Sequence, residues 1–436
     1  MFDSLLRATI GHSRIRSVEF SATPYRNETD RERIEGVQVA RFNDVWTYAR
    51  QNLRFYHWWA EEHNIPDRID SINELREFPR LTKATLVSRA SEVFTDDRGR
   101  TIPLAYSTGG STGTPTRYPR GKNEGIRFYA NTYTGRSWWG IQPFDSYVHV
   151  WGHAHLFGGS RLSRMKRSML DRLANATRVN AYDMSAAALV SHTNTILRRN
   201  PRYVVGYTSA LCKIARHIEK NQLDVSGLTN LRAIVVTAET VTPADVRLIE
   251  QAFRVPVVIE YGAAETGVIA TSRNGSWPLQ VLWKSFIVTV RDDSDLAVTT
   301  LDDRIFPLIN YSIGDAAIGG DIREGNALTL AAVLGRSKES VIVSTETGEA
   351  LELSAILPVH ILKGFEGVDA VQYRQESARR LTIFIAFSRD ISLDSIASKF
   401  IATLRTDHPS FDPTSVVFKE ITEPILTAAG KQSLFI

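Results

Sequence analysis

Apolar and polar positions in the middle of the chain follow the two periods that distinguish strands from helices. Buried strands are predicted over 232–236 and 257–260, and an amphipathic helix between them begins at Thr242 with Pro243 in its first turn. A strand–helix–strand unit of this length implies a parallel pair of strands with a right-handed crossover. The pattern therefore predicts an α/β body.

The flanking segments extend this body. Residues 31–64 have apolar side chains at helical spacing, and Pro66 just beyond them suits the end of a helix. A second short helix is predicted over 70–77. The same criteria predict further strands over 104–107, 147–151 and 203–206, and further helices over 185–199 and from Thr208 or Ser209 onward.

The pattern of apolar and polar residues changes after residue 280. Short alternating or β-branched runs predict a more antiparallel region, with strands over 286–290, 296–300 and 328–331. Beyond it, strands are predicted over 341–343, 370–373 and 381–386, and helices near 354–363 and 394–405. We therefore expect a large N-terminal domain (1–334) with parallel sheets and a β subdomain, followed by a small C-terminal α+β domain (335–436).

Composition excludes several classes of protein. The chain has 436 residues, of which 43% are hydrophobic and 23% charged, so it is neither disordered nor fibrous as a whole. With 52 basic and 48 acidic residues, its net charge of +4 is too balanced to favour nucleic acid. The single cysteine, Cys212, excludes a disulfide framework. No membrane span is expected, because no apolar run approaches ~18 residues. The N-terminal stretch lacks the apolar core of a secretory signal, so we expect a cytoplasmic enzyme.

A loop rich in glycine and hydroxyl side chains follows the predicted strand at 104–107. It consists of Ser107, Thr108, Gly109, Gly110, Ser111, Thr112 and Gly113. Glycines let backbone N–H groups face an anion, and hydroxyls donate further hydrogen bonds, so the loop suits a polyphosphate. A surface turn is the alternative interpretation.

Four more motifs carry candidate chemistry. Glu260–Gly267 lies at the carboxyl end of a predicted parallel strand, where ligands bind to open α/β sheets. Within it Tyr261 offers a flat ring, and Glu265 offers a carboxylate of the kind that Mg²⁺ prefers. Asp315 ends the run Tyr-Ser-Ile-Gly-Asp, for which a turn is the alternative. Arg336 lies in the Gly335–Glu339 stretch at the expected domain boundary, and Lys431 follows Gly430 near the C-terminus, where a solvated charge is the alternative.

The order and spacing of these motifs resemble the adenylate-forming superfamily of acyl-CoA ligases and adenylation domains. Within it the chain looks most like the phenylacetate–CoA ligase and CapK-like branch. The resemblance implies that a carboxylate attacks ATP to give an acyl-adenylate and pyrophosphate, with Mg²⁺ as cofactor. The acyl group would then pass to a thiol of CoA or of a carrier protein's phosphopantetheine. The implied partners are a small-molecule acid and this acceptor, without nucleic acid.

The resemblance also implies roles for individual residues. Those implied to bind ATP are the 107–113 loop, Ala238, Glu239, Tyr261, Gly262, Asp315 and Arg336. Glu265 would hold Mg²⁺, and Lys431 would come from the mobile small domain to contact the carboxylate and the α-phosphate.

The acyl pocket is implied to include Trp151, His153, Tyr207 and Gly262. Its aromatic surroundings, which we expect to include Trp138 and Trp139, suit an aromatic or planar acid, although an ordinary aromatic core is the alternative. His153 would act as a base or orient the acid, unless it is a packing residue.

The chain departs from the family pattern in several positions. Thr114 replaces a lysine of the phosphate loop, unless Arg117 or Arg120 supplies that cation, and Ala264 replaces a hydroxyl residue. The segment 344–348 replaces the Arg-Gly stretch that lines the pantetheine tunnel of CoA ligases. Two alternatives follow, namely transfer to an amine or other nitrogen nucleophile, and a catalytically silent nucleotide-binding homologue.

A basic helical stretch between residues 161 and 172 is a further candidate for binding. It contains Arg161, Arg164, Lys166, Arg167 and Arg172. It would contact the 3′-phosphate of CoA or the acidic helix of a carrier protein, and a solvated helix face is the alternative.

Overall fold

The structure is a computed structural model of the whole chain. It describes residues 15–16, 18–96, 98, 105–107, 117–121, 124–152, 161–181, 183–290, 295–323, 326–336, 340–354, 362, 368–377, 379–387, 392–422, 425 and 436. Most of the helix expected near 354–363 lies outside these residues.

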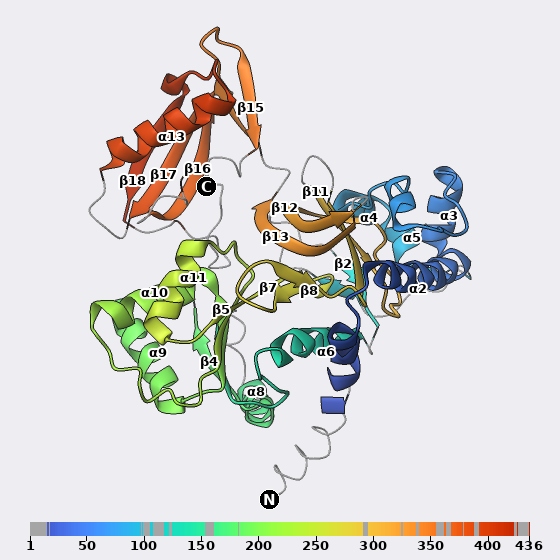
Figure 1. Ribbon diagram of the computed structural model, residues 1–436, viewed down its shortest axis with the longest axis horizontal. Helices are drawn as coiled ribbons and strands as arrows, with labels where there is room; N and C mark the ends of the chain where they lie inside the picture. Colours follow the sequence, from blue (N-terminus) through green and yellow to red (C-terminus); the bar gives the residue numbers. More distant parts are fainter. Residues whose placement is uncertain are drawn as a thin grey trace, which may run out of the picture.

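The N-terminal part of the chain is helical (Figure 1). Its elements are α2 (Arg31–Asn52), α3 (Arg54–Glu62), the 3₁₀ helix η1 (Ile72–Arg76), α4 (Lys83–Ser88) and α5 (Ala90–Val93). The predicted helical region 31–64 is divided because Leu53 adopts an extended conformation, with φ −121° and ψ 116°. Trp46, Tyr56 and Trp59 form a separate aromatic core here. They pack against Phe306 and Leu308, which are distant in the sequence.

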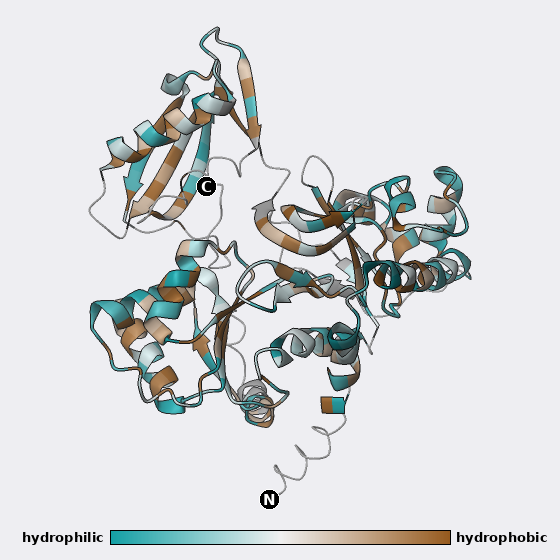
Figure 2. Cartoon of the chain, viewed as in Figure 1, coloured by the Kyte–Doolittle hydropathy of each residue, from teal (hydrophilic) through white to brown (hydrophobic). Residues whose placement is uncertain are grey.

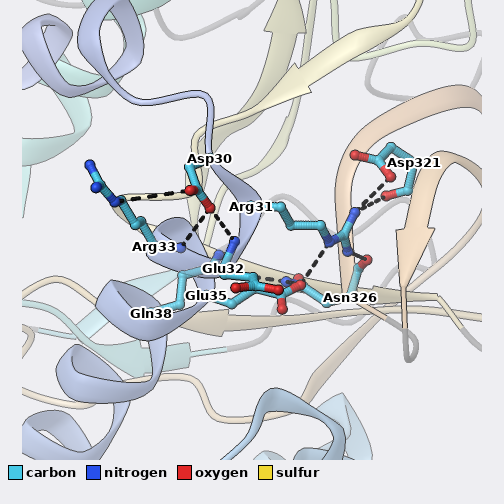
Figure 3. Close-up of polar contacts among 8 residues, drawn as sticks. All are labelled: Asp30, Arg31, Glu32, Arg33, Glu35, Gln38, Asp321 and Asn326. Atoms are coloured by element: carbon cyan, nitrogen blue, oxygen red, sulfur yellow. Dashed lines mark hydrogen bonds and ion pairs between the residues drawn. The ribbon is translucent and has the colours of Figure 1, made fainter.

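Hydrogen bonds join helix α2 to the hairpin of strands β12 (Tyr311–Arg323) and β13 (Asn326–Arg336) (Figure 3). Asp30 caps the helix by accepting from the backbone N–H of Glu32 at 2.9 Å. The guanidinium of Arg31 donates to Asp321 Oδ1 at 2.6 Å and to the Asn326 carbonyl at 2.8 Å. These bonds join residues about 290 positions apart in the sequence. They hold the turn end of the hairpin, and Asp315 lies on β12 toward the opposite end.

A mixed sheet forms the body of the large domain. In the described part of the chain its strand order is β10-β11-β12-β13-β9-β8-β7-β6-β5-β3-β4. The parallel half consists of β3 (Tyr147–Trp151), β4 (Ala176–Asn180), β5 (Tyr203–Tyr207), β6 (Ala233–Thr237) and β7 (Val257–Ala263). The crossovers between its strands contain α8 (Arg161–Ala174), α9 (Ala186–Arg199), α10 (Thr208–Lys220) and α11 (Pro243–Phe253).

Alternate residues of these parallel strands enter two different cores. Val204, Ile234 and Val236 pack with apolar residues of α10 and α11 on one face. Val205 and Val235 point to the other face, where they meet Tyr133 from α6 (Glu124–Ser137). Because both faces are covered by helices, these strands are hydrophobic on both sides, as their continuous apolar runs predicted.

The other half of the sheet is antiparallel. It consists of β8 (Gly267–Ser272), β9 (Leu279–Val281), β10 (Phe286–Val290), β11 (Asp295–Thr300), β12 (Tyr311–Arg323) and β13 (Asn326–Arg336). Strands β1 (Ala105–Ser107) and β2 (Arg117–Pro119) form a separate short hairpin.

The chain beyond residue 340 builds its own sheets and core (Figure 2). A hairpin of β14 (Ser340–Ser344) and β15 (Ala350–Ser354) precedes a sheet of β16 (Val368–Ser377), β17 (Arg380–Phe387) and β18 (Val416–Ile421). Helix α13 (Leu393–Asp407) and the 3₁₀ turn η2 (Pro413–Ser415) lie between β17 and β18. Figure 2 shows brown, hydrophobic segments along the strands of this part of the chain. Its separate core includes Val371, Ile383 and Phe400.

The fold class predicted from the sequence is confirmed. The predicted unit 232–260 is present as β6, α11 and parallel β7, and Thr242 and Asp245 form the capping box of α11 with Pro243 in its first turn. The short helix predicted over 70–77 is the 3₁₀ helix η1. None of the helices in the described ranges is long and apolar enough to cross a membrane.

Candidate functional site

The carboxyl ends of β5, β6 and β7 lie side by side at one edge of the parallel sheet. Tyr207 ends β5, Ala238 and Glu239 follow β6 directly, and Tyr261 lies near the end of β7. Because parallel strands end at the same edge, four of the predicted site residues meet there.

Tyr261 is bound to Asp315. Its phenol Oη donates a hydrogen bond to Asp315 Oδ2 at 3.0 Å. Burial and the nearby charge of Asp315 raise the pKa of Tyr261 well above its ordinary value, so the phenol remains a donor at neutral pH. Asp315 lies within strand β12, and the alternative interpretation of this residue as part of a turn is wrong.

Strand pairing brings Arg336 to the same place. Strands β12 and β13 are antiparallel, and in their register Asp315 stands opposite Arg336. Only the backbone of Arg336 is described. Three motifs from separate parts of the sequence, at 261, 315 and 336, therefore converge at one position of the sheet.

The Ala238–Glu239 segment is held in an unusual conformation. Ala238 has φ +67°, in the left-handed region. The carboxylate of Glu239 accepts hydrogen bonds from the backbone N–H of Ser209 at 2.8 Å and from its Oγ at 3.0 Å. Ser209 lies in the first turn of α10, whose partial positive charge favours a carboxylate. The end of β6 is thereby attached to the start of α10.

The turn that carries Glu265 is fixed through its backbone carbonyls. The guanidinium of Arg304 donates to the carbonyl oxygens of Glu265 at 2.8 Å and Thr266 at 3.1 Å. The phenol of Tyr118, in β2, donates to the carbonyl of Ala264 at 2.6 Å. Burial lowers the pKa of Arg304, because the charged form is removed from water. The turn is therefore tied both to β2, which follows the predicted phosphate loop, and to the 301–306 segment.

Two arginines flank one ring beside this turn. The guanidinium carbons of Arg120 and Arg304 lie 4.2 Å and 4.9 Å from the ring centroid of Phe128, in α6. Arg120 is one of the two residues that the sequence offers as a substitute for the phosphate-loop lysine. Its role at the phosphate loop stays a prediction.

Gly262 is required by a close approach of the backbone. A Cβ atom at this position would lie 2.1 Å from the carbonyl oxygen of Gly267. Any side chain would therefore push apart the two ends of the Glu265 turn.

A buried ion pair that the sequence does not predict lies next to the site, at the residue before Tyr261. Arg136, in α6, donates from Nε and Nη2 to the two carboxylate oxygens of Glu260 at 2.6 and 2.9 Å. Its Nη1 donates to the Tyr203 phenol at 3.1 Å, and that phenol lies 3.0 Å from the phenol of Tyr133. Only 8% of Arg136 and 5% of Glu260 is exposed. The pair fixes the residue immediately before Tyr261, and nothing in the local sequence of α6 indicates it.

The predicted acyl-pocket residues are only partly brought together. The rings of Trp151 and Tyr207 lie 4.3 Å apart between centroids, on the neighbouring carboxyl ends of β3 and β5. Trp138 packs on Tyr25, and Trp139 donates to the carbonyl of Ser272, so both belong to the scaffold around β8. The expectation that these aromatic residues surround the acid stays a prediction.

Several predicted residues lie outside the described part of the chain. These are Thr108, Gly109, Gly110, Ser111, Thr112, Gly113, His153 and Lys431. For Ser107 only its place at the end of β1 is described. Their predicted roles stay predictions.

The residues near β7 fit a magnesium ion that is shared with a phosphate ligand. Among the described residues, no three His, Cys, Asp or Glu side chains gather as a metal site. Mg²⁺ is typically held by one or two carboxylates together with substrate phosphates, and does not require a cage of protein ligands. A single carboxylate at Glu265, on a turn fixed by Arg304 and Tyr118, suits that mode of binding.

Comparison with known proteins supports the family resemblance. The chain is 22% identical to protein CapK of Staphylococcus aureus over 384 residues, which is 83% of this chain and 80% of CapK. No family model matches the chain. The similarity to CapK confirms the predicted resemblance to the CapK-like branch.

Solved structures confirm the fold. A 2-hydroxyisobutyryl-CoA ligase in the postadenylation state superposes with a TM-score of 0.67 at 16% identity, over 95% of this chain and 91% of the ligase. The amide bond synthetase McbA from Marinactinospora thermotolerans superposes with a TM-score of 0.51 at 16% identity, over 77% of this chain and 69% of McbA. The chain therefore has the fold of adenylate-forming enzymes.

Proposed function

We propose that this CapK-like chain, with the fold of adenylate-forming enzymes, activates a carboxylic acid with ATP and transfers the acyl group to a thiol of CoA or a carrier protein. The observation that carries the proposal is the convergence of Tyr261, Asp315 and the Arg336 position at the carboxyl edge of the sheet. A planar ring hydrogen-bonded to a carboxylate, with a basic residue at the opposite strand position, suits adenine, ribose hydroxyls and phosphate in turn. We further propose that the reaction takes place in the cytoplasm.

Each of these residues would contact a different part of ATP. The ring of Tyr261 would stack on adenine, and the Ala238–Glu239 segment would lie along the edge of the base. Asp315 would accept hydrogen bonds from the ribose hydroxyls, while its bond to Tyr261 keeps the ring and the carboxylate in fixed relation. Positioning of this kind supplies much of the catalysis in phosphoryl and nucleotidyl transfer.

The chemical step joins two anions. A carboxylate oxygen of the acid attacks the α-phosphorus of ATP, the bond from that phosphorus to the bridging oxygen breaks, and pyrophosphate leaves with the electron pair. Lys431 would lie against the carboxylate and α-phosphate, and Arg120 beside the departing pyrophosphate. A magnesium ion bound by Glu265 would neutralise phosphate charge.

Two alternatives remain distinct from this proposal. The first is transfer to an amine, motivated by the altered segment 344–348, which the structure describes as the tip of the β14–β15 hairpin, with Glu346 paired to Arg405 of α13. The second is a silent nucleotide-binding homologue, motivated by Thr114 and Ala264. In place of a hydroxyl contact, the backbone of Ala264 accepts from Tyr118.

The test is isotope exchange between pyrophosphate and ATP, with Mg²⁺ present and CoA absent, against a panel of aryl, fatty and amino acids. Exchange that depends on one acid supports adenylation and identifies the acid class. The Lys431→Ala variant should then lose exchange by orders of magnitude. ATP binding without exchange for any acid would favour the silent homologue. With the acid known, product formation with CoA or with amines separates the two acceptors.

A further inference from the structure

Helix α8 presents apolar side chains to solvent. Met165, Met169 and Leu170 are 68%, 62% and 54% exposed. Residues four positions apart lie on the same face of a helix, so Met165 and Met169 stand one above the other and Leu170 lies beside them. A crossover helix normally turns its apolar side toward the sheet, and a cluster of exposed apolar side chains marks a surface that binds something.

The same helix is strongly basic. Its sequence, Arg-Leu-Ser-Arg-Met-Lys-Arg-Ser-Met-Leu-Asp-Arg-Leu-Ala, has five basic residues and one acidic residue. That acidic residue, Asp171, accepts from Arg178 of β4 at 2.9 Å. The charge of Asp171 is therefore paired with a residue of a neighbouring strand. The excess of positive charge within this one helix is as large as the net charge of the whole chain, +4.

The position of α8 leaves it accessible to a large flat partner. The helix connects β3 to β4, and β4 is an end strand of the mixed sheet. Figure 1 shows α8 at the lower edge of the large domain. The hydrogen bonds described above for the candidate nucleotide site come from other elements than α8.

We propose that α8 docks the protein on the surface of an anionic lipid bilayer. Met165, Met169 and Leu170 would enter the boundary between headgroups and acyl chains, and the excess of basic residues would provide attraction to anionic headgroups. A helix of 14 residues is about 21 Å long, shorter than the ~30 Å of hydrocarbon in a bilayer. It therefore lies in the plane of the interface and does not cross it. The proposal does not depend on the function proposed above.

Charge and shape favour a bilayer over the other occupants of this face. A second copy of the chain would bring two equally basic helices together, which is electrostatically unfavourable. The acidic helix of a carrier protein would match the charge. However, three apolar side chains projecting from one helix at the end of a sheet suit a fluid partner, because a protein partner requires a surface of complementary shape.

Co-sedimentation of the full-length chain with vesicles tests the proposal. One set of vesicles contains phosphatidylcholine alone and the other phosphatidylcholine with phosphatidylglycerol. Binding to the anionic vesicles should be at least about tenfold stronger at low salt, and should weaken as salt rises, because Lys and Arg side chains contribute through screened attraction.

The double variant Met165→Gln/Met169→Gln keeps the charge and should reduce binding to anionic vesicles about tenfold. Val190→Gln, at a 48% exposed apolar position of α9, is the matched control and should bind as the parent does. Circular dichroism and ATP binding verify that the variants fold, and Met169→Leu should retain binding.

Three results would overturn the proposal. The first is equal binding to neutral and anionic vesicles, or none to either. The second is undiminished binding by the double variant. The third is capture of an acidic carrier protein, or self-association seen by light scattering, that the double variant loses while the parent ignores vesicles.

Discussion

The phenol of Tyr261 and the carboxylate of Asp315 are 54 residues apart in the sequence and joined by a hydrogen bond of 3.0 Å. One residue lies near the end of a parallel strand and the other lies in an antiparallel strand, so the bond crosses between the two halves of the mixed sheet. It couples the ring proposed to stack on adenine to the carboxylate proposed to bind ribose.

The Tyr261→Phe substitution tests this coupling. Phenylalanine keeps the ring but removes the donor, and a hydrogen bond to a charged group contributes about 1.5–3 kcal/mol. We expect the KM for ATP in pyrophosphate exchange to rise by roughly tenfold or more, while kcat changes little. Asp315→Ala should cost more, since it also removes the ribose contact. A fall in kcat with an unchanged KM for Tyr261→Phe would contradict the assignment.

The Arg136–Glu260 pair should be essential for stability. The Arg136→Met variant leaves Glu260 buried without its partner, and breaking a buried pair in this way costs about 3–5 kcal/mol. The free energy of unfolding of the large domain, measured from its transition in urea, should fall by that amount. The double variant Arg136→Met/Glu260→Met should recover much of the loss, because no buried charge remains.

The pair of Arg178 and Asp171 provides the comparison. It is also an arginine–carboxylate contact, at 2.9 Å, but its side chains are 30% and 22% exposed. Arg178→Met should cost only about 0–1 kcal/mol, as for other solvent-screened pairs. If both arginines cost the same, burial would not be the cause of the Arg136 effect.

Two glycines should respond in opposite directions to alanine. Gly262→Ala would place a Cβ atom 2.1 Å from the Gly267 carbonyl oxygen, so the Glu265 turn must shift. We expect a loss of exchange activity of at least about tenfold and a lower Tm. At Gly36, inside helix α2, an added Cβ would meet no atom within 4 Å, and Gly36→Ala should stabilise the chain by about 0.5–1 kcal/mol. Normal activity in Gly262→Ala would refute the close packing of this turn.

Local signals were sufficient to predict the elements that carry the site. The helix signals of Thr242 and Pro243 and the apolar runs around them specify β6, α11 and β7 without help from the rest of the chain. The family resemblance assigns Tyr261 and Asp315 to one predicted nucleotide site, and in the structure the two side chains are joined by a hydrogen bond.

Contacts between distant segments could not be read from the sequence. Arg136 lies on α6 among residues whose spacing gives no sign of a buried partner, and Glu260 is 124 positions away. Trp138 lies close to Trp151 in the sequence and packs on Tyr25, a contact of which the sequence gives no sign. Sequence proximity indicates which aromatic residues are present in the region, and only the sheet register decides which of them meet.

High pH should destabilise the protein through its buried tyrosines. Burial raises the pKa of Tyr56 and of Tyr203 well above the ordinary value of 10.0. Below about pH 10 both the folded and the unfolded chain keep these protons, so stability does not depend on them. Above about pH 10 the unfolded chain releases them and the folded chain does not, and the free energy of unfolding falls by about 1.4 kcal/mol per pH unit for each tyrosine.

Tyr56→Phe separates this effect from general alkaline damage. At pH 7 the variant loses the hydrogen bond from the phenol to the Pro307 carbonyl, which should cost about 1 kcal/mol. Above about pH 10 it has one proton fewer to retain, so its stability should fall less steeply than that of the parent, and the two curves should approach each other. Urea denaturation at several pH values measures both curves. Parallel curves above pH 10 would mean that Tyr56 ionises as readily in the folded chain as in the unfolded one, which its place between Trp46, Trp59 and Phe306 argues against.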